Sequence, residues 1–517
     1  MTENSFDNYE ILTMENITKV FPNGTVANDN VNFSLRKGEI HALMGENGAG
    51  KSTLMRILYG IESAESGTIK INGEIVNINS SLTAMQLGIG MVHQHFMLIP
   101  SLSVYENIML GHEPTRLGML LNINEARRLT KEISTHYNFE INPDEIVENL
   151  PVSTKQKIEI LKALIRDAHI LILDEPTAVL TPQETKELFV QLKKLREDGY
   201  SIIFISHKLG EIKEICDRMT IMRSGKLVTT CDVDAVSKSD ISRMMIGRDI
   251  SLTVDKKKAE PKEVVLEVKG ISKETQEGKP ILTDVSFAVR KGEILGIVGV
   301  AGNGQSELVD VITGMSSASK GELLLSGKIM HSLNIRERRN NHMAFIPEDR
   351  MTFGCAAEMS IEENLISDSV YSKEYNKGVL LNTAAIKNFS NDMIAKYNIK
   401  TSGAESAIKT LSGGNIQKVV VARELASDPA IIIADQPSRG IDIGASMFIY
   451  DKLVEMRDNG CAVLLISADI TEVLELSDYL IVMYGGEIVA RFDDVDNLDA
   501  DELGLYMLGL KRQAVNE

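Results

Sequence analysis

Long hydrophobic runs are missing from this sequence. No stretch of about 18 apolar residues occurs in its 517 positions, so no segment predicts a membrane-spanning helix. The segment from Met1 to Asn8 is polar and acidic, which does not fit a secretory signal. We therefore expect the chain to work in the cytoplasm, alone or against a membrane surface.

Cysteine and positive charge are also scarce. The four cysteines are scattered, with no pair at metal-ligand spacing, and they are typical of buried thiols in a reducing compartment: Cys216, Cys231, Cys355 and Cys461. Lysine and arginine number 55 against 73 acidic residues, and the net charge of −18 argues against a broad nucleic-acid-binding surface. The length predicts two or more hydrophobic cores.

A phosphate-binding loop follows the apolar run Ile40–Met44, which predicts a strand. The loop reads Gly45-Glu46-Asn47-Gly48-Ala49-Gly50-Lys51-Ser52. Glycines at these spacings let backbone N–H groups converge on phosphate oxygens at a helix N-terminus. Lys51 would neutralise the β- and γ-phosphates, and the Ser52 hydroxyl would reach Mg²⁺. The sequence therefore predicts an ATP and Mg²⁺ site.

Two acidic residues end a second apolar run, Ile170–Leu173. Asp174 is placed to hold Mg²⁺ through water, and Glu175 is placed to polarise the attacking water. A third run, Ser201–Ile205, precedes His207. These short β-branched runs alternate with helical segments, which predicts a largely parallel sheet flanked by helices.

The chain is a duplication. Gln305 lies 254 residues after Lys51, and Glu348 lies 254 after Gln94. Beyond Glu348 the offset grows to 261, as Asp435 shows relative to Asp174. We expect a first domain over 10–250, a charged linker over 251–263 and a second domain over 264–512.

The whole set of motifs resembles the ATP-binding cassette family, whose signature stands here as Leu411-Ser412-Gly413-Gly414-Asn415. The fused cassettes are similar to the ATPase subunits of bacterial simple-sugar and nucleoside importers. The tripeptide sequence His95-Phe96-Met97 favours the nucleoside branch. The resemblance implies an α/β fold of two tandem P-loop nucleotide-binding domains. Each would have a mainly parallel core sheet, an antiparallel β subdomain and a helical subdomain.

The resemblance also assigns roles. Phe21 would stack on adenine, Gln94 would bridge Mg²⁺ and a membrane partner, and His207 would contact the γ-phosphate. The cassettes would pack head to tail, so that the signature of one completes the ATP site of the other. The complete site would then take its residues from both halves: Phe21, Gly45 to Thr53, Gln94, Asp174, Glu175, His207, Ser412, Gly413 and Gly414.

The other site departs from the family pattern at nearly every position. Its loop keeps Gly299, Gly302, Gly304 and Ser306, but Gln305 replaces the lysine. The other replacements are Thr275 for the aromatic residue, Glu348 for glutamine, Gln436 after Asp435 for the catalytic glutamate, Ala468 for histidine and Leu150-Pro151-Val152-Ser153 for the signature. Each replacement also has an interpretation in which it does not impair the site. Pro151 suits a first helical turn, and Gln305 could still hydrogen-bond phosphate. Their concentration in one site predicts that it does not hydrolyse ATP.

The predicted function is ATP-driven import, with the chain lying peripherally on the cytoplasmic face of the membrane. Two integral membrane permeases would dock near Gln94 and Glu348, and an extracytoplasmic substrate-binding lipoprotein would deliver the substrate. No residue of this chain need touch that substrate. The alternative is a soluble twin-cassette ATPase acting on ribosomes or nucleic acid. Such proteins, by resemblance, keep both sites intact and carry a long charged helical linker, and this chain has neither.

Overall fold

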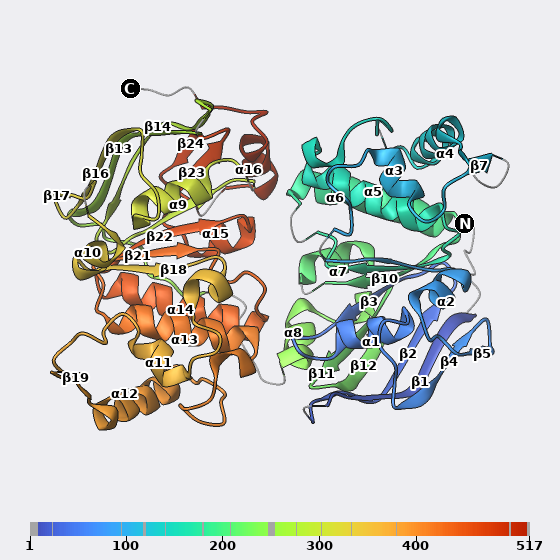
Figure 1. The fold of residues 1–517 in the computed structure, drawn as a ribbon, viewed down its shortest axis with the longest axis horizontal. Coiled ribbons are helices and arrows are strands. Elements are labelled where there is room, and N and C mark those ends of the chain that lie inside the picture. The colour runs from blue at the N-terminus through green and yellow to red at the C-terminus, as the bar shows by residue number, and fades with distance from the viewer. Residues whose placement is uncertain are drawn as a thin grey trace. The chain divides into compact units, whose positions relative to one another are not determined.

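The computed structural model describes residues 9–22, 24–94, 96–116, 120–139, 141–177, 180–206, 208–246, 254–275, 277–300, 302–331, 333–378, 380–495 and 498–513. The chain divides into two units, Met1–Ile250 and Ser251–Glu517. Figure 1 labels their elements. Among the described residues, no helix combines the length and the apolar character needed to cross a membrane.

The first unit begins with three strands, after which helices and strands are interspersed. Its strands are β1 (Glu10–Val20), β2 (Val26–Arg36), β3 (Ile40–Met44), β4 (Ser66–Ile71), β5 (Glu74–Val76), β6 (Ile89–Val92), β7 (Thr115–Arg116), β8 (Leu120–Leu121), β9 (Ile170–Asp174), β10 (Ser201–Ile205), β11 (Arg218–Arg223) and β12 (Lys226–Asp232). Its helices are α1 (Lys51–Leu58), α2 (Ser81–Gln86), α3 (Val104–Met109), α4 (Ile123–His136), α5 (Val152–Leu164), α6 (Pro182–Glu197), α7 (Leu209–Ile215) and α8 (Lys238–Ile246), with short 3-10 turns at Val147–Asn149 and Val233–Ala235.

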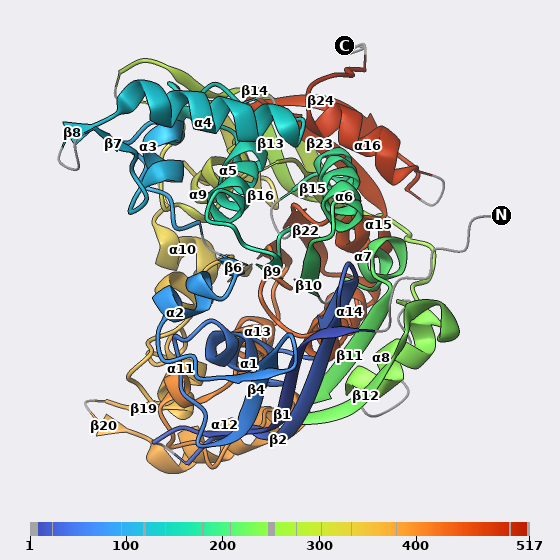
Figure 2. The same cartoon turned by 90° about the vertical axis from the view of Figure 1, so that its right-hand side faces the viewer.

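Two sheets enclose the core of this unit. The six-stranded sheet has the order β12-β11-β3-β10-β9-β6, and only β12 runs antiparallel to its neighbour. The four-stranded sheet, β2-β1-β4-β5, is antiparallel. Helix α1 contributes Leu54, Met55 and Leu58 to a core that also contains residues of both sheets. Helices α3, α4 and α5 pack together as a helical subdomain (Figures 1 and 2).

The second unit repeats this plan. Its strands are β13 (Val264–Glu274), β14 (Pro280–Arg290), β15 (Ile294–Val298), β16 (Lys320–Leu325), β17 (Lys328–Ile329), β18 (Met343–Ile346), β19 (Asn376–Lys377), β20 (Leu380–Leu381), β21 (Ile431–Asp435), β22 (Ala462–Ser467), β23 (Tyr479–Tyr484) and β24 (Glu487–Phe492). Its helices are α9 (Gln305–Thr313), α10 (Ile335–Asn340), α11 (Ile361–Ile366), α12 (Thr383–Lys396), α13 (Gly413–Ala426), α14 (Ile443–Asp458), α15 (Ile470–Leu476) and α16 (Ala500–Met507), with a π-helical turn at Arg350–Gly354 and a 3-10 turn at Ile408–Thr410.

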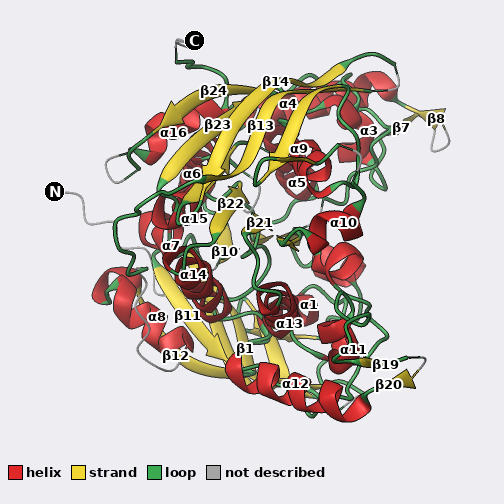
Figure 3. Cartoon of the chain, turned by 90° about the vertical axis from the view of Figure 1, so that its left-hand side faces the viewer, coloured by secondary structure: helices red, strands yellow, loops and turns green. Residues whose placement is uncertain are grey.

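The strand order of the second unit, β18-β21-β22-β15-β23-β24, matches that of the first strand for strand. Helix α9 again lies in one core with both sheets. Helix α16 packs on β23 and β24, as Figure 3 shows. The predicted fold class is therefore confirmed: each unit has a mainly parallel core sheet, an antiparallel β subdomain and a helical subdomain.

The extra residues of the second half are spread over three places. The capping serines Ser103 and Ser360, which precede α3 and α11, are separated by 257 positions instead of 254. The capping residues Asn122 and Asn382, before α4 and α12, are separated by 260. One more residue enters before the 3-10 turn at Ile408–Thr410. The insertions therefore lengthen loops around the helical subdomain and leave the core sheet unchanged.

The described part of the expected linker lies along the second unit. The ammonium group of Lys256 donates to the carbonyl of Ser477 at 2.6 Å, and Arg457 donates to the carbonyl of Lys257 at 3.0 Å. The amide of Lys262 donates to the carbonyl of Lys291 at 3.0 Å. We call residues 256–262 the strap, because they are fixed to the unit that follows them.

Arg457 anchors this strap from a buried position. Its side chain is 1% exposed and pairs with Asp478 at 2.7 Å, whose carboxylate is also buried. The equivalent pair of the first unit, Arg196 with Asp217, is far more exposed. Burial, which raises the pKa of Asp478, already penalises that charge. Loss of one partner should therefore cost more stability in the buried pair of the second unit than in the exposed pair of the first.

We predict that Arg457→Met destabilises the second unit by about 3–5 kcal/mol, because it leaves a buried carboxylate without its cation. Differential scanning calorimetry should show a transition lowered by roughly 10 °C. Arg196→Met is the matched control and should cost at most about 1 kcal/mol. Equal shifts for the two variants would contradict the assignment of Arg457 as an anchor.

Candidate functional site

The phosphate loop of the first unit joins β3 to α1 and depends on two glycines. Gly45 has φ +148°, and a Cβ there would lie 2.3 Å from the carbonyl oxygen of Met222. Gly50 has φ +97°, and a Cβ would lie 2.2 Å from the carbonyl oxygen of Ala27. Both positions therefore exclude every other residue. Gly50 is also the N-cap of α1 and offers its first turn no side-chain hydrogen bond, as at helix starts that bind anions.

Lys51 points back into this loop. Its ammonium group donates to the carbonyls of Gly45 at 2.7 Å and Glu46 at 3.0 Å, and the residue is 7% exposed. Ser52 and Thr53 follow on the first turn of α1 and are half-buried, while Asn47 and Gly48 are exposed. The loop thus places one buried cation beside the N-terminal turn of α1, an arrangement that suits phosphate.

The acidic pair lies at the end of β9, beside β10. The amide of Glu175 donates to the carbonyl of Ile205 at 2.9 Å, and Glu175 has a left-handed φ of +48°. Burial and the charge of Glu175 raise the pKa of Asp174 to about 6, although Lys51 and Arg56 oppose this shift. A nearby cation stabilises the charged form of a carboxyl group whose pKa is raised by burial. Asp174 is therefore suited to be a Mg²⁺ ligand.

Gln94 reaches the acidic pair from the segment after β6. Its side-chain amide donates to a carboxylate oxygen of Glu175 at 2.9 Å. The structure thus brings Gln94, Lys51, Asp174 and Glu175 together at the carboxyl end of the core sheet. Phe21 lies in the turn after β1, with the Lys19 ammonium 5.5 Å from its ring centroid. His207 lies outside the described residues.

The second unit keeps the backbone of this site and changes its chemistry. Gly304 has φ +99°, as Gly50 has +97°, and the Gln305 side chain folds inward to donate to the carbonyl of Val300 at 3.4 Å. Gly299 has a buried position against Gln305, whereas Gly302 and Ser306 are exposed. The cation of Lys51 thus becomes a neutral amide in the same place.

Gln436 takes the backbone conformation of Glu175 without its carboxylate. Its φ is +48°, and its amide donates to the carbonyl of Ile466 at 2.8 Å. Its side-chain oxygen accepts a hydrogen bond of 3.3 Å from the amide of Ala468. Gln436 therefore keeps the backbone geometry of Glu175 but carries a group that accepts no proton.

A further charge difference was missed by the motif comparison. Burial and the charge of Asp310 raise the pKa of Asp435 to about 7. Asp310 lies five residues after Gln305, where the first unit has Arg56 five residues after Lys51. One unit therefore places a cation near its strand-end aspartate and the other an anion. The fixed offset of 254 residues was the signal that could have found this pair.

The helices that follow the two signatures begin differently. Ser412 is the N-cap of α13, and the Asn415 side chain donates to its hydroxyl oxygen at 2.8 Å. Pro151 is the N-cap of α5, and Val152 follows at the position of Gly413. At another replaced position, the Thr275 hydroxyl accepts from the amides of Glu277 and Lys279, closing a turn after β13.

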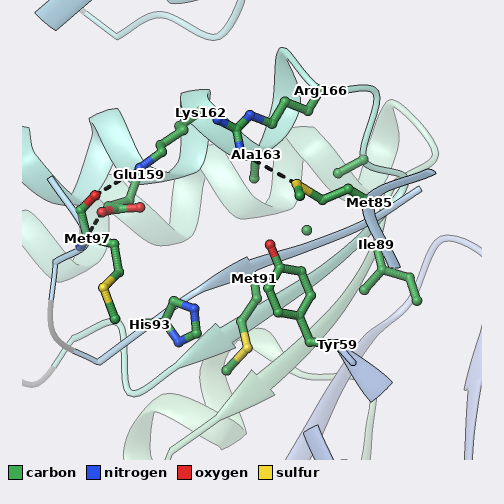
Figure 4. Close-up of a pocket in the computed structure, with 12 residues that line it drawn as sticks. Tyr59, Met85, Ile89, Met91, His93, Met97, Glu159, Lys162, Ala163 and Arg166 are labelled. Carbon is green, nitrogen blue, oxygen red and sulfur yellow. Dashed lines mark hydrogen bonds between the residues drawn. The ribbon is translucent and has the colours of Figure 1, made fainter. Parts of the chain in front are cut away.

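A cavity of about 120 Å³ lies beside the Gln94 segment of the first unit (Figure 4). One wall is α5 with the residues just after it, and the other is β6 with Tyr59. Glu159 accepts from the amide of Met97 at 2.6 Å, and Lys162 donates to the carbonyl of Met97 at 2.9 Å. The segment that carries Gln94 to the acidic pair is therefore also attached to the cavity wall.

The model of the family described as ABC transporter matches residues 28–178 and 282–439. The guanosine import ATP-binding protein NupO of Bacillus subtilis is 44% identical over 96% of this chain and 97% of its own length. The nucleoside import ATP-binding protein NupA of Lactococcus lactis is 40% identical over 97% and 99%.

A further relative is named for sugar import. The glucose import ATP-binding protein TsgD13 of Haloferax volcanii is 40% identical over 96% of each chain. Among solved structures, the archaeal ribosome recycling factor aABCE1, in complex with the stalk protein aP1, aligns over 92% of this chain and 90% of its own, with a TM-score of 0.59 and 18% identity. That last likeness concerns the fold alone. From the family match in both units and the near-full-length relatives, the chain belongs to the ABC transporter family.

Proposed function

We propose that the chain is the ATP-hydrolysing, energy-coupling subunit of an importer for nucleosides or simple sugars. The observation that carries this proposal is similarity of 40–44% over nearly the whole chain to proteins named as import ATP-binding proteins. We favour nucleosides, because the His95-Phe96-Met97 wording and the guanosine and nucleoside relatives agree. The ribosome-acting alternative has only the fold likeness in its favour.

ATP would be hydrolysed at the first cassette. The loop amides of Gly45 to Gly50 and the Lys51 ammonium would bind phosphate, and Ser52, Gln94 and Asp174 would hold Mg²⁺. Bound Mg²⁺ neutralises charge on the phosphates. Glu175 accepts the proton of the attacking water, and Gln94 holds its carboxylate in place. Phe21, Thr53, His207 and the signature residues Ser412, Gly413 and Gly414 complete this site in the proposal.

The second cassette would not hydrolyse ATP. Gln436 lacks the base, Gln305 lacks the cation, and Asp310 adds a negative charge beside Asp435. Loss of a general base alone costs about 10²–10⁴ in rate, and these losses act together. The two cassettes therefore divide the work, with a single hydrolytic site in each chain.

We predict that Glu175→Gln lowers steady-state ATPase activity of the assembled transporter to below about a tenth, because the amide accepts no proton. Phosphate release at saturating ATP measures this rate. The matched control is Gln436→Ala at the equivalent position of the second cassette, which should keep most of the activity. A Glu175→Gln rate above about a tenth would mean that the second site turns over.

We also predict that Asp174→Asn stabilises the metal-free and nucleotide-free protein. The pKa of Asp174 is about 6 when folded and about 4 when unfolded, so the charged form costs about 2–3 kcal/mol in the folded state. That cost is absent below about pH 4, grows as the pH rises and is complete above about pH 6.

Thermal unfolding in a chelator checks this expectation. The gain in the melting temperature of the first unit from Asp174→Asn should be full at pH 8 and about half as large at pH 5. Asp435→Asn is the matched variant of the second unit, and its gain should continue to grow up to about pH 7. A gain independent of pH would show that desolvation of the carboxylate is not its source.

Two integral membrane permeases and an extracytoplasmic substrate-binding lipoprotein would be the partners, with this chain on the cytoplasmic face. We propose that one permease inserts an apolar side chain into the cavity beside Gln94. Tyr59, Met91 and Ala163 give the cavity its apolar lining. An occupant would press on the Met97 segment, and Gln94 would pass that displacement to Glu175. No residue of this chain would touch the transported molecule.

Met97→Glu tests the docking site, because Met97 lines the cavity and is 59% exposed. A charge there should reduce co-purification of the permeases roughly tenfold, as loss of a central interface contact does. Ile75→Glu is the control, since Ile75 is 73% exposed on β5 and does not line the cavity. Equal recovery of permeases with both variants would remove the cavity from the docking surface.

A further inference from the structure

A cluster of charged side chains joins two loops of the second unit. Glu348, after β18, forms an ion pair with Arg439, which follows β21. Arg350 donates to the carbonyl oxygens of Arg439 at 2.8 Å and Gly440 at 3.2 Å. We call Glu348, Arg350 and Arg439 the arginine clasp. Its ion pair offsets the negative charge of Glu348, which stands where the family pattern has a neutral glutamine.

The position of Arg350 is fixed by its own segment. Arg350 begins the π-helical turn Arg350–Gly354. The preceding carboxylate, Asp349, accepts from the amides of Met351 at 2.9 Å and Thr352 at 3.1 Å and from the Thr352 hydroxyl at 2.6 Å. The turn therefore holds the guanidinium group toward the loop after β21.

The first half has no such cluster in its sequence. Phe96 stands at the position of Arg350, and Ala178 at the position of Arg439. In the first unit the glutamine-bearing segment instead contacts the catalytic base, through Gln94 and Glu175. The clasp thus replaces a contact to a reacting group by a structural contact between loops.

The clasp lies directly against the start of the signature helix. A Cβ on Gly413 would lie 2.8 Å from a guanidinium nitrogen of Arg350 and 3.5 Å from the carbonyl oxygen of Gly440. A Cβ on Gly414 would lie 2.9 Å from Cβ of Ala445, on α14. The two glycines therefore let α13 begin between the clasp on one side and α14 on the other.

We propose that Arg350 is a positioning residue for ATP hydrolysis at the first cassette. It fixes the place and direction of Ser412, Gly413 and Gly414. This inference rests on the proposed function, in which those residues complete the intact ATP site. A planar guanidinium group bonded to two successive carbonyls has little freedom, so it holds the helix start more rigidly than a lysine would. On this account, the altered residues of the second cassette serve hydrolysis in the first.

Small displacements of positioned groups cost large factors in rate. In the assembled transporter, Arg350→Ala should lower kcat roughly tenfold or more while KM for ATP changes less than about twofold. Arg350→Lys, which keeps the charge but not the paired geometry, should recover part of the loss. Glu348→Gln removes the ion pair with Arg439 but leaves Arg350 in place, so it should lower kcat by a smaller factor. It provides the test if the Arg350→Ala protein folds poorly.

A double substitution separates this role from a general effect. If Arg350 acts through the signature, Arg350→Ala combined with Ser412→Ala should cost little more than Ser412→Ala alone. Arg512→Ala is the control, because Arg512 forms an exposed ion pair with Glu487 in the same unit. It should leave kcat unchanged.

Three results would overturn the inference while leaving the proposed function intact. These are normal kcat in Arg350→Ala when Ser412→Ala is impaired, fully multiplicative losses in the double variant, and a raised KM with unchanged kcat. The last would mean that Arg350 binds nucleotide directly. Activity that survives Glu175→Gln would instead overturn the single-site function on which the inference is built.

Discussion

The burial of one short helix between two sheets sets the geometry of each unit. Helix α1 packs its apolar face into a core shared by the parallel and antiparallel sheets, so its first turn has a fixed place. The loop before it runs close to neighbouring strands, and only glycine fits at Gly45 and Gly50. The parallel register then brings the end of β9, with Asp174, beside β10. Phosphate binding thus depends on packing that occurs several residues away.

The same scaffold supports two different electrostatic environments. Lys51 and Arg56 stand near the strand-end aspartate of the first unit, whereas Gln305 and Asp310 occupy those positions in the second. The backbone conformations at Glu175 and Gln436 are nevertheless equal, with φ +48° at both. Duplication preserved the framework while individual charges were exchanged. The difference between the units is therefore chemical, and it follows from few side chains.

Much of the fold and site could be predicted from the sequence, because the informative residues stand next to one another. The strands before both phosphate loops, the strand ending at Asp174 and the repeat offset are all local patterns. What remained hidden depends on residues far apart in sequence. Arg350 contacts Gly440, which lies 90 residues later in the sequence. No sequence motif predicts that Arg439 pairs with Glu348. From the sequence alone, Glu348 is therefore only a departure from the family pattern, because its partner Arg439 lies far along the chain.

The strap has a consequence for the order in which the chain acquires its structure. Lys257 meets its anchor, Arg457, 200 residues later in the sequence. At synthesis rates of about 5–20 residues per second, the strap waits roughly 10–40 s for that anchor to be made. All of the first unit has been translated before that interval begins. The segment between the units is therefore fixed from its far end, late in biogenesis, after the first cassette has had time to fold by itself.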